Sequence, residues 1–208
     1  MRTLVVATGN PGKLREIRQT LGDLPVRVVG LRDLPPLDEP AETGDTFAAN
    51  ARDKATYYAR ATGHWCVADD SGLVVDALGG RPGVYSARYA ADRCDPDAGR
   101  DVVDAANNAK LLDELADVPD ERRTARFVCA LALSDGETIL IETDGTVEGR
   151  IARTERGSNG FGYDPLFHLP SRGVTTAELP PDAKNAISHR GQATRRFATE
   201  LKTLLATA

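Results

Sequence analysis

The chain has 208 residues, a net charge of −5 at pH 7, and 41% hydrophobic against 27% charged residues. This composition is typical of a folded globular protein and excludes intrinsic disorder, and the acidic balance argues against binding to a nucleic-acid backbone. No apolar run approaches the ~20 residues that span a bilayer, and the one near the N-terminus is too short for a signal peptide, so we expect a cytoplasmic protein without a membrane partner.

Three cysteines are spread along the chain and form no C-x-x-C pair. This pattern predicts neither a disulfide framework nor a zinc site. Cys66 and Cys129 lie within apolar runs, where a small buried thiol is the expected environment.

The first part of the chain alternates predicted strands with predicted helices. Apolar β-branched runs indicate strands over residues 3–7, 26–29 and 65–68. Helical spacing of apolar residues predicts a helix over 14–22 and another over 47–62, the second preceded by Thr46 as its N-cap. We expect the strand over 65–68 to end at a pair of acidic residues.

In the second part of the chain the predicted strands cluster. The elements expected there are a short strand over 73–78, a helix over 97–115, a hairpin of strands 127–133 and 138–142, a strand over 147–152, and helices over 181–185 and 192–205. Alternation followed by clustering predicts one α/β domain over residues 1–208 with a mixed sheet and flanking helices.

Thr8-Gly9-Asn10-Pro11-Gly12-Lys13 separates the first predicted strand from the first predicted helix. Glycines allow a ligand to approach the backbone, a helix N-terminus offers unpaired N–H groups, and Lys13 adds a full charge, so this segment could cradle a phosphate. It is not a P-loop, because two residues rather than four separate the glycines and Leu14 follows the lysine. The alternative is an ordinary turn with a solvated lysine.

Asp69-Asp70-Ser71-Gly72 follows an apolar run. Carboxylates at the end of a strand commonly face a ligand crevice, and Mg²⁺ takes one or two carboxylates together with substrate phosphates. Adjacent side chains project differently, so one acid could hold a metal while the other positions it or a water molecule. The alternative is a polar turn.

Three glycines alternate with Phe161 and Tyr163 between Gly157 and Pro165. Exposed rings in such a loop could stack on a base. The alternative is that both rings fold back onto the core.

Two segments are rich in basic side chains. Lys184, His189 and Arg190 lie within seven residues and could donate hydrogen bonds to a carbonyl edge, the alternative being a charged surface turn between helices. The cluster of Arg122, Arg123 and Arg126 is expected to be a solvated face.

Taken together, these segments favour a Mg²⁺-assisted nucleotide phosphohydrolase. Six motifs then occur in order, TGNPGK, ETGDTFAANARDKA, ADDSGL, ALGGRPGVYSARYA, GFGYDPLF and ISHRGQA. In this respect the chain resembles the inosine triphosphate pyrophosphatase family, the non-canonical purine NTP pyrophosphatases, over nearly its whole length.

The resemblance implies hydrolysis of ITP, dITP and XTP to the monophosphate and pyrophosphate, which removes non-canonical purines from the nucleotide pool. It further implies a Mg²⁺ cofactor, a homodimer, and an elongated mixed sheet with two lobes around a central cleft. The sequence departs from the family at Ala49, where an acid is usual, and at Asn159, where a glycine is usual.

The resemblance also assigns roles to individual residues. Those implied to bind the triphosphate or contact substrate are Thr8, Gly9, Asn10, Pro11, Gly12, Lys13, Lys54 and Ser71. Those implied for Mg²⁺ are Glu42, Asp69 and Asp70, with Asp70 also the catalytic base. Those implied to enclose the base and sugar are Phe161, Gly162, Tyr163 and Asp164, and those implied to read the purine are Lys184, His189 and Arg190.

Three other functions remain as alternatives. A septum-inhibition-type phosphatase would prefer pyrimidine or canonical triphosphates, although the SHRG and GFGYDP motifs favour purines. A non-catalytic nucleotide-binding module would not need the pair Asp69 and Asp70. A structural oligomer subunit would need none of the six motifs.

Overall fold

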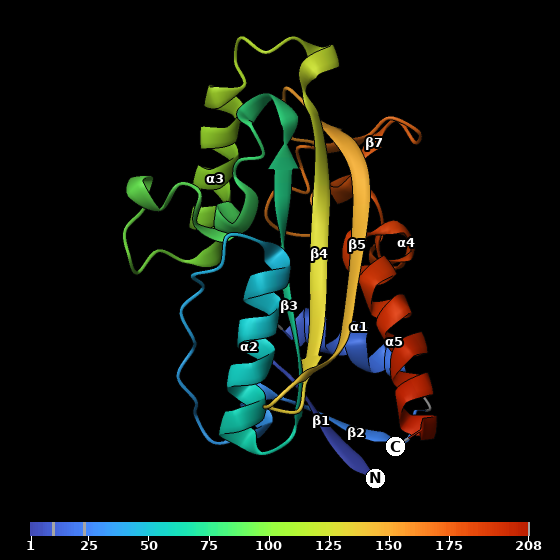
Figure 1. Cartoon of the computed structure of the whole chain (residues 1–208). Helices are drawn as coiled ribbons and strands as arrows, with labels where there is room; N and C mark the ends of the chain where they lie inside the picture. Colours follow the sequence, from blue (N-terminus) through green and yellow to red (C-terminus); the bar gives the residue numbers. More distant parts are fainter. Residues whose placement is uncertain (10, 23, 208) are drawn as a thin grey trace. The chain divides into compact units, whose positions relative to one another are not determined.

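The computed structural model describes residues 1–9, 11–22 and 24–207. In this part of the chain seven strands form one sheet in the order β2-β1-β3-β4-β5-β6-β7 (Figure 1). The strands are β1 Arg2–Val6, β2 Val26–Gly30, β3 Trp65–Val75, β4 Thr124–Ser134, β5 Ile139–Ile151, β6 Phe167–Leu169 and β7 Val174–Thr175. The sheet is mixed, since β1 runs parallel to β2 and β3 whereas β6 runs antiparallel to β5 and β7.

Five α-helices accompany the sheet in the described ranges. They are α1 Pro11–Leu21, α2 Phe47–Thr62, α3 Arg100–Glu114, α4 Pro181–Ile187 and α5 His189–Thr207. The predicted α/β class with a mixed sheet and flanking helices is therefore confirmed.

The chain divides into two compact units. Unit 1 comprises Met1–Asp70, Cys129–Gly145 and His189–Ala208, and unit 2 comprises Ser71–Val128 and Thr146–Ser188. The central cleft, and the action of residues 1–208 as one domain, stay predictions.

In unit 1, helices cover both faces of the sheet. Trp65 and Val67 of β3 belong to a core cluster with Phe197 of α5, whereas Cys66 belongs to a different cluster with Tyr58 of α2. Successive side chains of a strand point to opposite faces, so odd-numbered residues of this part of β3 face α1 and α5 and even-numbered residues face α2.

Local signals placed α2 correctly at both ends. Thr46 Oγ1 accepts a hydrogen bond from Ala49 N over 3.1 Å, and Gly63 ends the helix with a left-handed φ of 66°. Two helices begin three residues earlier than predicted. α1 begins at Pro11 instead of residue 14, since proline suits the first helical turn, and α5 begins at His189 instead of residue 192. The short strands β6 and β7 were not predicted.

The prediction that β3 ends at its acidic pair is wrong. The strand continues from Trp65 to Val75, so Asp69 and Asp70 lie in its interior and the two strands predicted over 65–68 and 73–78 are one. β5 likewise runs unbroken where two strands were predicted. Buried acids are tolerated in a strand only when they are paired, and the partners of both acids are described below.

Unit 2 has its own apolar core, in which the rings of Phe127 and Phe167 lie 4.4 Å apart. Arg123 is 2% exposed, so its predicted place on a solvated face is wrong. Its guanidinium donates to the carbonyl oxygens of Leu115 (2.6 Å), Ile151 (2.9 Å) and Ala152 (3.2 Å). These bonds give hydrogen-bond donors to backbone carbonyl groups at the C-terminal end of α3 and at the end of β5.

The two cysteines in apolar runs are fully buried, as predicted. Burial raises the pKa of both the Cys66 and the Cys129 thiol to about 12. Over the described ranges, no helix combines the length and the apolar character needed to cross a membrane.

Candidate active site

Asp69 and Asp70 point to opposite faces of β3 and bind different helices of unit 1. Asp69 Oδ2 lies 2.7 Å from Lys13 Nζ of α1 and 3.5 Å from Arg190 Nε of α5. Asp70 meets α2 instead, accepting a hydrogen bond from Asn50 Nδ2 over 2.9 Å. The strand therefore presents one acid to a pair of cations and the other to an amide.

The environment of Asp69 keeps it ionised. Burial alone would raise the pKa of this carboxyl, but the ammonium of Lys13 and the guanidinium of Arg190 outweigh burial and hold the pKa well below its usual range. Its predicted role as a metal ligand stays a prediction, since one of its oxygens is shared between two cations here.

The pKa of Asp70 is shifted in the opposite direction. Burial raises its pKa, and the nearby carboxylates of Glu42 and Asp69 add to this, although Lys54 and Asn50 oppose it. Lys54 Nζ lies 2.8 Å from Glu42 Oε1 and 3.6 Å from Asp70 Oδ1. Burial lowers the pKa of Lys54, but Asp70 and Glu42 outweigh it and the pKa is raised. One ammonium thus draws two carboxylates together.

Asn50 is a site residue that the sequence analysis missed. It is 1% exposed, donates to Asp70, and accepts a hydrogen bond from Gly44 N over 2.8 Å at its Oδ1. Because a carboxylate only accepts and a backbone N–H only donates, these two bonds fix the orientation of the amide. Its position four residues before Lys54, on the same helix face, is the signal that could have found it.

The predicted phosphate-binding segment is described in part. Thr8 follows β1, and Pro11 and Gly12 open α1, while Asn10 lies outside the described residues. A Cβ added at Gly9 would have no heavy atom of the described residues within 4 Å, so these residues leave room for a ligand beside the Gly9 backbone. Lys13 is the third residue of α1, and it is the one of these residues that a described ion pair joins to an acid.

His189 and Arg190 are the first residues of α5 and are nearly buried. A cation at a helix N-terminus is unfavourable for the helix dipole, and Asp69 offsets that cost at Arg190. The approach of β5 to this turn requires a glycine, because a Cβ at Gly145 would lie 2.1 Å from His189 O. This helix start is therefore held in place by β5 and by Asp69.

In unit 2 the loop between β5 and β6 is organised by Asp164. One carboxylate oxygen of Asp164 accepts from Phe161 N over 2.8 Å and also binds the ammonium of Lys184, while the other accepts from Thr176 Oγ1 over 2.8 Å. A Cβ at Gly160 would collide with this carboxylate, which explains a glycine there.

The two aromatic residues of this loop differ in exposure. Phe161 is 44% exposed, and Lys184 Nζ lies 5.0 Å from the centre of its ring. Tyr163 is 5% exposed and donates from its hydroxyl to Ser86 O over 2.9 Å, so this ring packs into the core. Phe161 is the more exposed ring of this pair.

The predicted site residues thus form two groups, one in each unit. The residues brought together in unit 1 are Lys13, Glu42, Lys54, Asp69, Asp70 and Arg190. Those brought together in unit 2 are Phe161, Asp164 and Lys184. Ser71 lies in β3, at the first position of unit 2.

Comparison with known proteins agrees with the resemblance found in the sequence. The sequence model of the Ham1 family matches residues 4–200. The chain belongs to the Ham1 family. Among Ham1 relatives, a dITP/XTP pyrophosphatase from Exiguobacterium sibiricum is 51% identical over 97% of this chain and 98% of its own. One from Geobacter sulfurreducens is 52% identical over 93% of each chain.

Solved structures share the fold. A HAM1 protein from Coxiella burnetii is 41% identical and superimposes with a TM-score of 0.84 over 100% of both chains. A nucleoside-triphosphatase, or dITP/XTP pyrophosphatase, from Mycobacterium abscessus is 46% identical with a TM-score of 0.76, over 94% of this chain and 98% of its own.

Proposed function

We propose that this Ham1 protein is a pyrophosphohydrolase that cleaves dITP, XTP and ITP to the monophosphate and pyrophosphate. Relatives about half identical over nearly the full length are dITP/XTP pyrophosphatases, which supports the reaction. The observation that carries the proposal is the pairing on β3, where Asp70 has a raised pKa beside Glu42 and Lys54 while Asp69 stays ionised between Lys13 and Arg190.

The acids of unit 1 fit a Mg²⁺ ion. No cluster of three or more potential metal-binding side chains occurs within the ranges that the structure describes. Mg²⁺ does not need one, because it is commonly held by one or two carboxylates together with substrate phosphates and water. Glu42 and Asp70 meet at a single cation, Lys54 Nζ, so their oxygens already converge on one positive charge. When bound, Mg²⁺ would neutralise charge on the phosphate chain.

The chain's own residues would supply the remaining chemistry. Residues 8–13 and Lys54 bind the triphosphate, with Lys13 and Lys54 screening its charge. Asp70 orients and deprotonates the attacking water, a role that its raised pKa favours. Asn50 occupies Oδ2 of Asp70 and leaves Oδ1 on the side of Lys54. The oxygen of that water attacks the α-phosphorus and forms the monophosphate. The bond from the α-phosphorus to the oxygen that bridges it to the β-phosphate breaks, and pyrophosphate leaves with this oxygen.

Base recognition depends on the oxygen at position 6 of the purine. ITP and XTP present an acceptor there, whereas ATP presents an amine donor. Donors from Lys184, His189 or Arg190 favour the oxygen, and a donor left facing the amine costs about 1–3 kcal/mol. Phe161 offers a stacking face, and Asp164 fixes the loop that carries this ring.

The proposal includes a homodimer, which the family resemblance implies. Tyr85 and Val102, each 59% exposed, are large apolar side chains of unit 2 that would suit a subunit contact. Sedimentation velocity measures the assembly directly, and a monomer at micromolar concentration would reject this part of the proposal.

A panel of triphosphates with detection of pyrophosphate tests the reaction. We expect release from dITP, XTP and ITP in the presence of Mg²⁺, weak release from dATP, and loss of release with a chelator. Asp70→Asn should lower turnover by at least about a hundredfold, in the range expected for a general base. Its circular dichroism spectrum should match that of the unmodified chain.

The same panel separates the alternatives. Preference for pyrimidine or canonical triphosphates would favour a septum-inhibition-type phosphatase. Binding of nucleotide without release of pyrophosphate would favour a non-catalytic module. Absence of both would leave a structural role.

A further inference from the structure

Helix α3 holds the peptide groups of Gly162 from both sides. Asp104 Oδ2 accepts a hydrogen bond from Gly162 N over 2.8 Å, and Asn108 Nδ2 donates to Gly162 O over 3.2 Å. Residues 104 and 108 are one turn apart and share a helix face, so a rigid element fixes both polar groups of one loop residue.

Both side chains are themselves anchored. Asp104 uses its other oxygen, Oδ1, to bind Arg100 Nε at 3.0 Å. Asn108 Nδ2 also donates to Glu155 Oε1 over 2.8 Å, near the start of the loop between β5 and β6. The loop is therefore attached to α3 at its start and at its centre.

The side chain of Asn108 is buried, and the two polar atoms of its amide differ in their hydrogen bonding. It is 4% exposed, and within the described part of the chain its Oδ1 has no hydrogen-bond partner. A buried carbonyl oxygen without a donor is unfavourable for folding, whereas Nδ2 of the same side chain donates to both Glu155 and Gly162. The contribution of Asn108 to this region is therefore its donating nitrogen.

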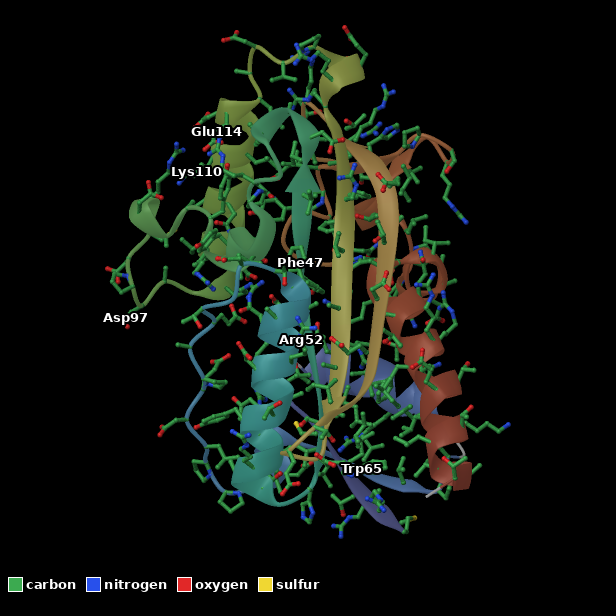
Figure 2. The ribbon with its side chains drawn as sticks, viewed as in Figure 1. Phe47, Arg52, Trp65, Asp97, Lys110 and Glu114 are labelled. Carbon is green, nitrogen blue, oxygen red and sulfur yellow. The ribbon has the colours of Figure 1, made fainter. Side chains whose placement is uncertain are left out.

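A neighbouring face of α3 holds the segment against which Tyr163 packs. Asn107 Oδ1 accepts a hydrogen bond from Ala90 N over 2.7 Å. Lys110 and Glu114, which Figure 2 labels on α3, both bind Tyr89: Lys110 Nζ donates to Tyr89 O over 2.7 Å, and the Tyr89 hydroxyl donates to Glu114 Oε2 over 2.6 Å. Ser86 O, in the same segment, accepts from the hydroxyl of Tyr163. Tyr163 is thus fixed inward on one side of Gly162, which leaves Phe161 outward on the other.

We propose that Asp104 and Asn108 are positioning residues for base selection, because by fixing Gly162 they set the ring of Phe161 against the purine. This inference rests on the proposed function, since it needs the loop to receive the base. Neither residue touches substrate. They act only through the loop, so the triphosphate-binding residues of unit 1 should be unaffected by their loss.

Four variants on one helix test the proposal. Asp104→Ala removes the acceptor for Gly162 N, whereas Asp104→Asn keeps an acceptor oxygen and serves as the conservative rescue. Asp101→Ala is the matched control, because Asp101 is exposed in the first turn of α3. Asn108→Ser, which shortens the donor on the other side of Gly162, is the second test if Asp104→Ala does not fold.

The readouts are kcat and KM for dITP and dATP, the inhibition constant of inorganic tripolyphosphate, and the melting temperature. With Asp104→Ala we expect KM for dITP to rise at least about fivefold, as befits the loss of one charge-assisted hydrogen bond, with kcat changing less than about twofold. The preference for dITP over dATP should narrow, while tripolyphosphate inhibition stays unchanged. Asp104→Asn and Asp101→Ala should behave as the unmodified chain does.

Two results would overturn the inference while leaving the reaction intact. One is an unchanged KM and selectivity in folded Asp104→Ala and Asn108→Ser. The other is an equal weakening of dITP and tripolyphosphate, which indicates general destabilisation. An unmodified chain that releases no pyrophosphate from dITP would instead reject the proposed function itself.

Discussion

Asn50 donates a hydrogen bond to Asp70 Oδ2 over 2.9 Å while it accepts one from Gly44 N over 2.8 Å. One buried amide therefore links the interior of β3 to the segment that carries Glu42, two residues before Gly44. The two carboxylates that meet at Lys54 are each positioned, directly or through the backbone, by the same side chain.

Replacing Asn50 with alanine should lower kcat for dITP about 10- to 100-fold, since a hydrogen bond to a charged group contributes about 1.5–3 kcal/mol. Steady-state kinetics of Asn50→Ala measure this loss. Thr46→Ala is the control, because it removes the N-cap of the same helix without touching Asp70 and should cost stability alone. An equal kcat in the two variants would contradict a role at Asp70.

Gly145→Ala should disturb the start of α5. The added methyl would lie 2.1 Å from His189 O and 2.8 Å from Ala193 N, so the helix must shift at a cost of about 1–3 kcal/mol. Displacement of Arg190 from Asp69 should lower the turnover of dITP. At Gly99, φ is −61° and an added methyl would meet no atom of the described part of the chain within 4 Å, so Gly99→Ala should leave turnover unchanged. Equal activities would show that β5 does not set this helix start.

Ala49→Glu should stabilise α2. Thr46 already caps Ala49 N, the third residue of the helix, and a glutamate there could bond back to Thr46 N to complete a capping box. We expect the free energy of unfolding to rise by about 0.3–1 kcal/mol. Thermal melts compare the Ala49→Glu variant with Ala48→Glu, which places the same charge near the helix N-terminus without the bond back to Thr46 N. A gain no larger than that of Ala48→Glu would argue against the capping box.

Arg123→Ala should lower the free energy of unfolding by about 2–4 kcal/mol, because buried carbonyl groups lose their donors. Urea denaturation measures the change. Arg122→Ala, at the exposed neighbouring position, should cost less than about 0.5 kcal/mol. Similar losses at both positions would indicate that the buried bonds contribute little to stability.

Local signals in the sequence were sufficient for some elements. Both ends of α2 followed from Thr46 and Gly63, since a cap and a left-handed glycine act on the turn next to them. The interior position of Asp69 and Asp70 did not follow, because Lys13 and Arg190 lie 56 and 121 residues from Asp69 in the chain. Without those partners in view, two consecutive acids indicate a strand end.

The two groups of candidate site residues, one in each unit, show the same limit of prediction from local sequence. Motifs predicted Lys54 and Asp70 as site residues. Asn50, which donates a hydrogen bond to Asp70, was overlooked because an asparagine in a helix has no chemical signature by itself. Phe161 and Tyr163 have similar sequence surroundings, and only tertiary packing against Ser86 decides which ring is buried.

The consecutive acids of β3 also bear on how the strand finds its alignment. If β3 shifted its register by one residue, one of the two acids would still face α1 and α5 and the other would still face α2. Ion pairs alone therefore do not distinguish the correct register from the shifted one. The flanking apolar side chains set the register, because a one-residue shift would turn Trp65 and Val67 away from the core that they share with Phe197. Correct alignment of the strand that carries Asp69 and Asp70 therefore depends on the hydrophobic side chains that flank this pair.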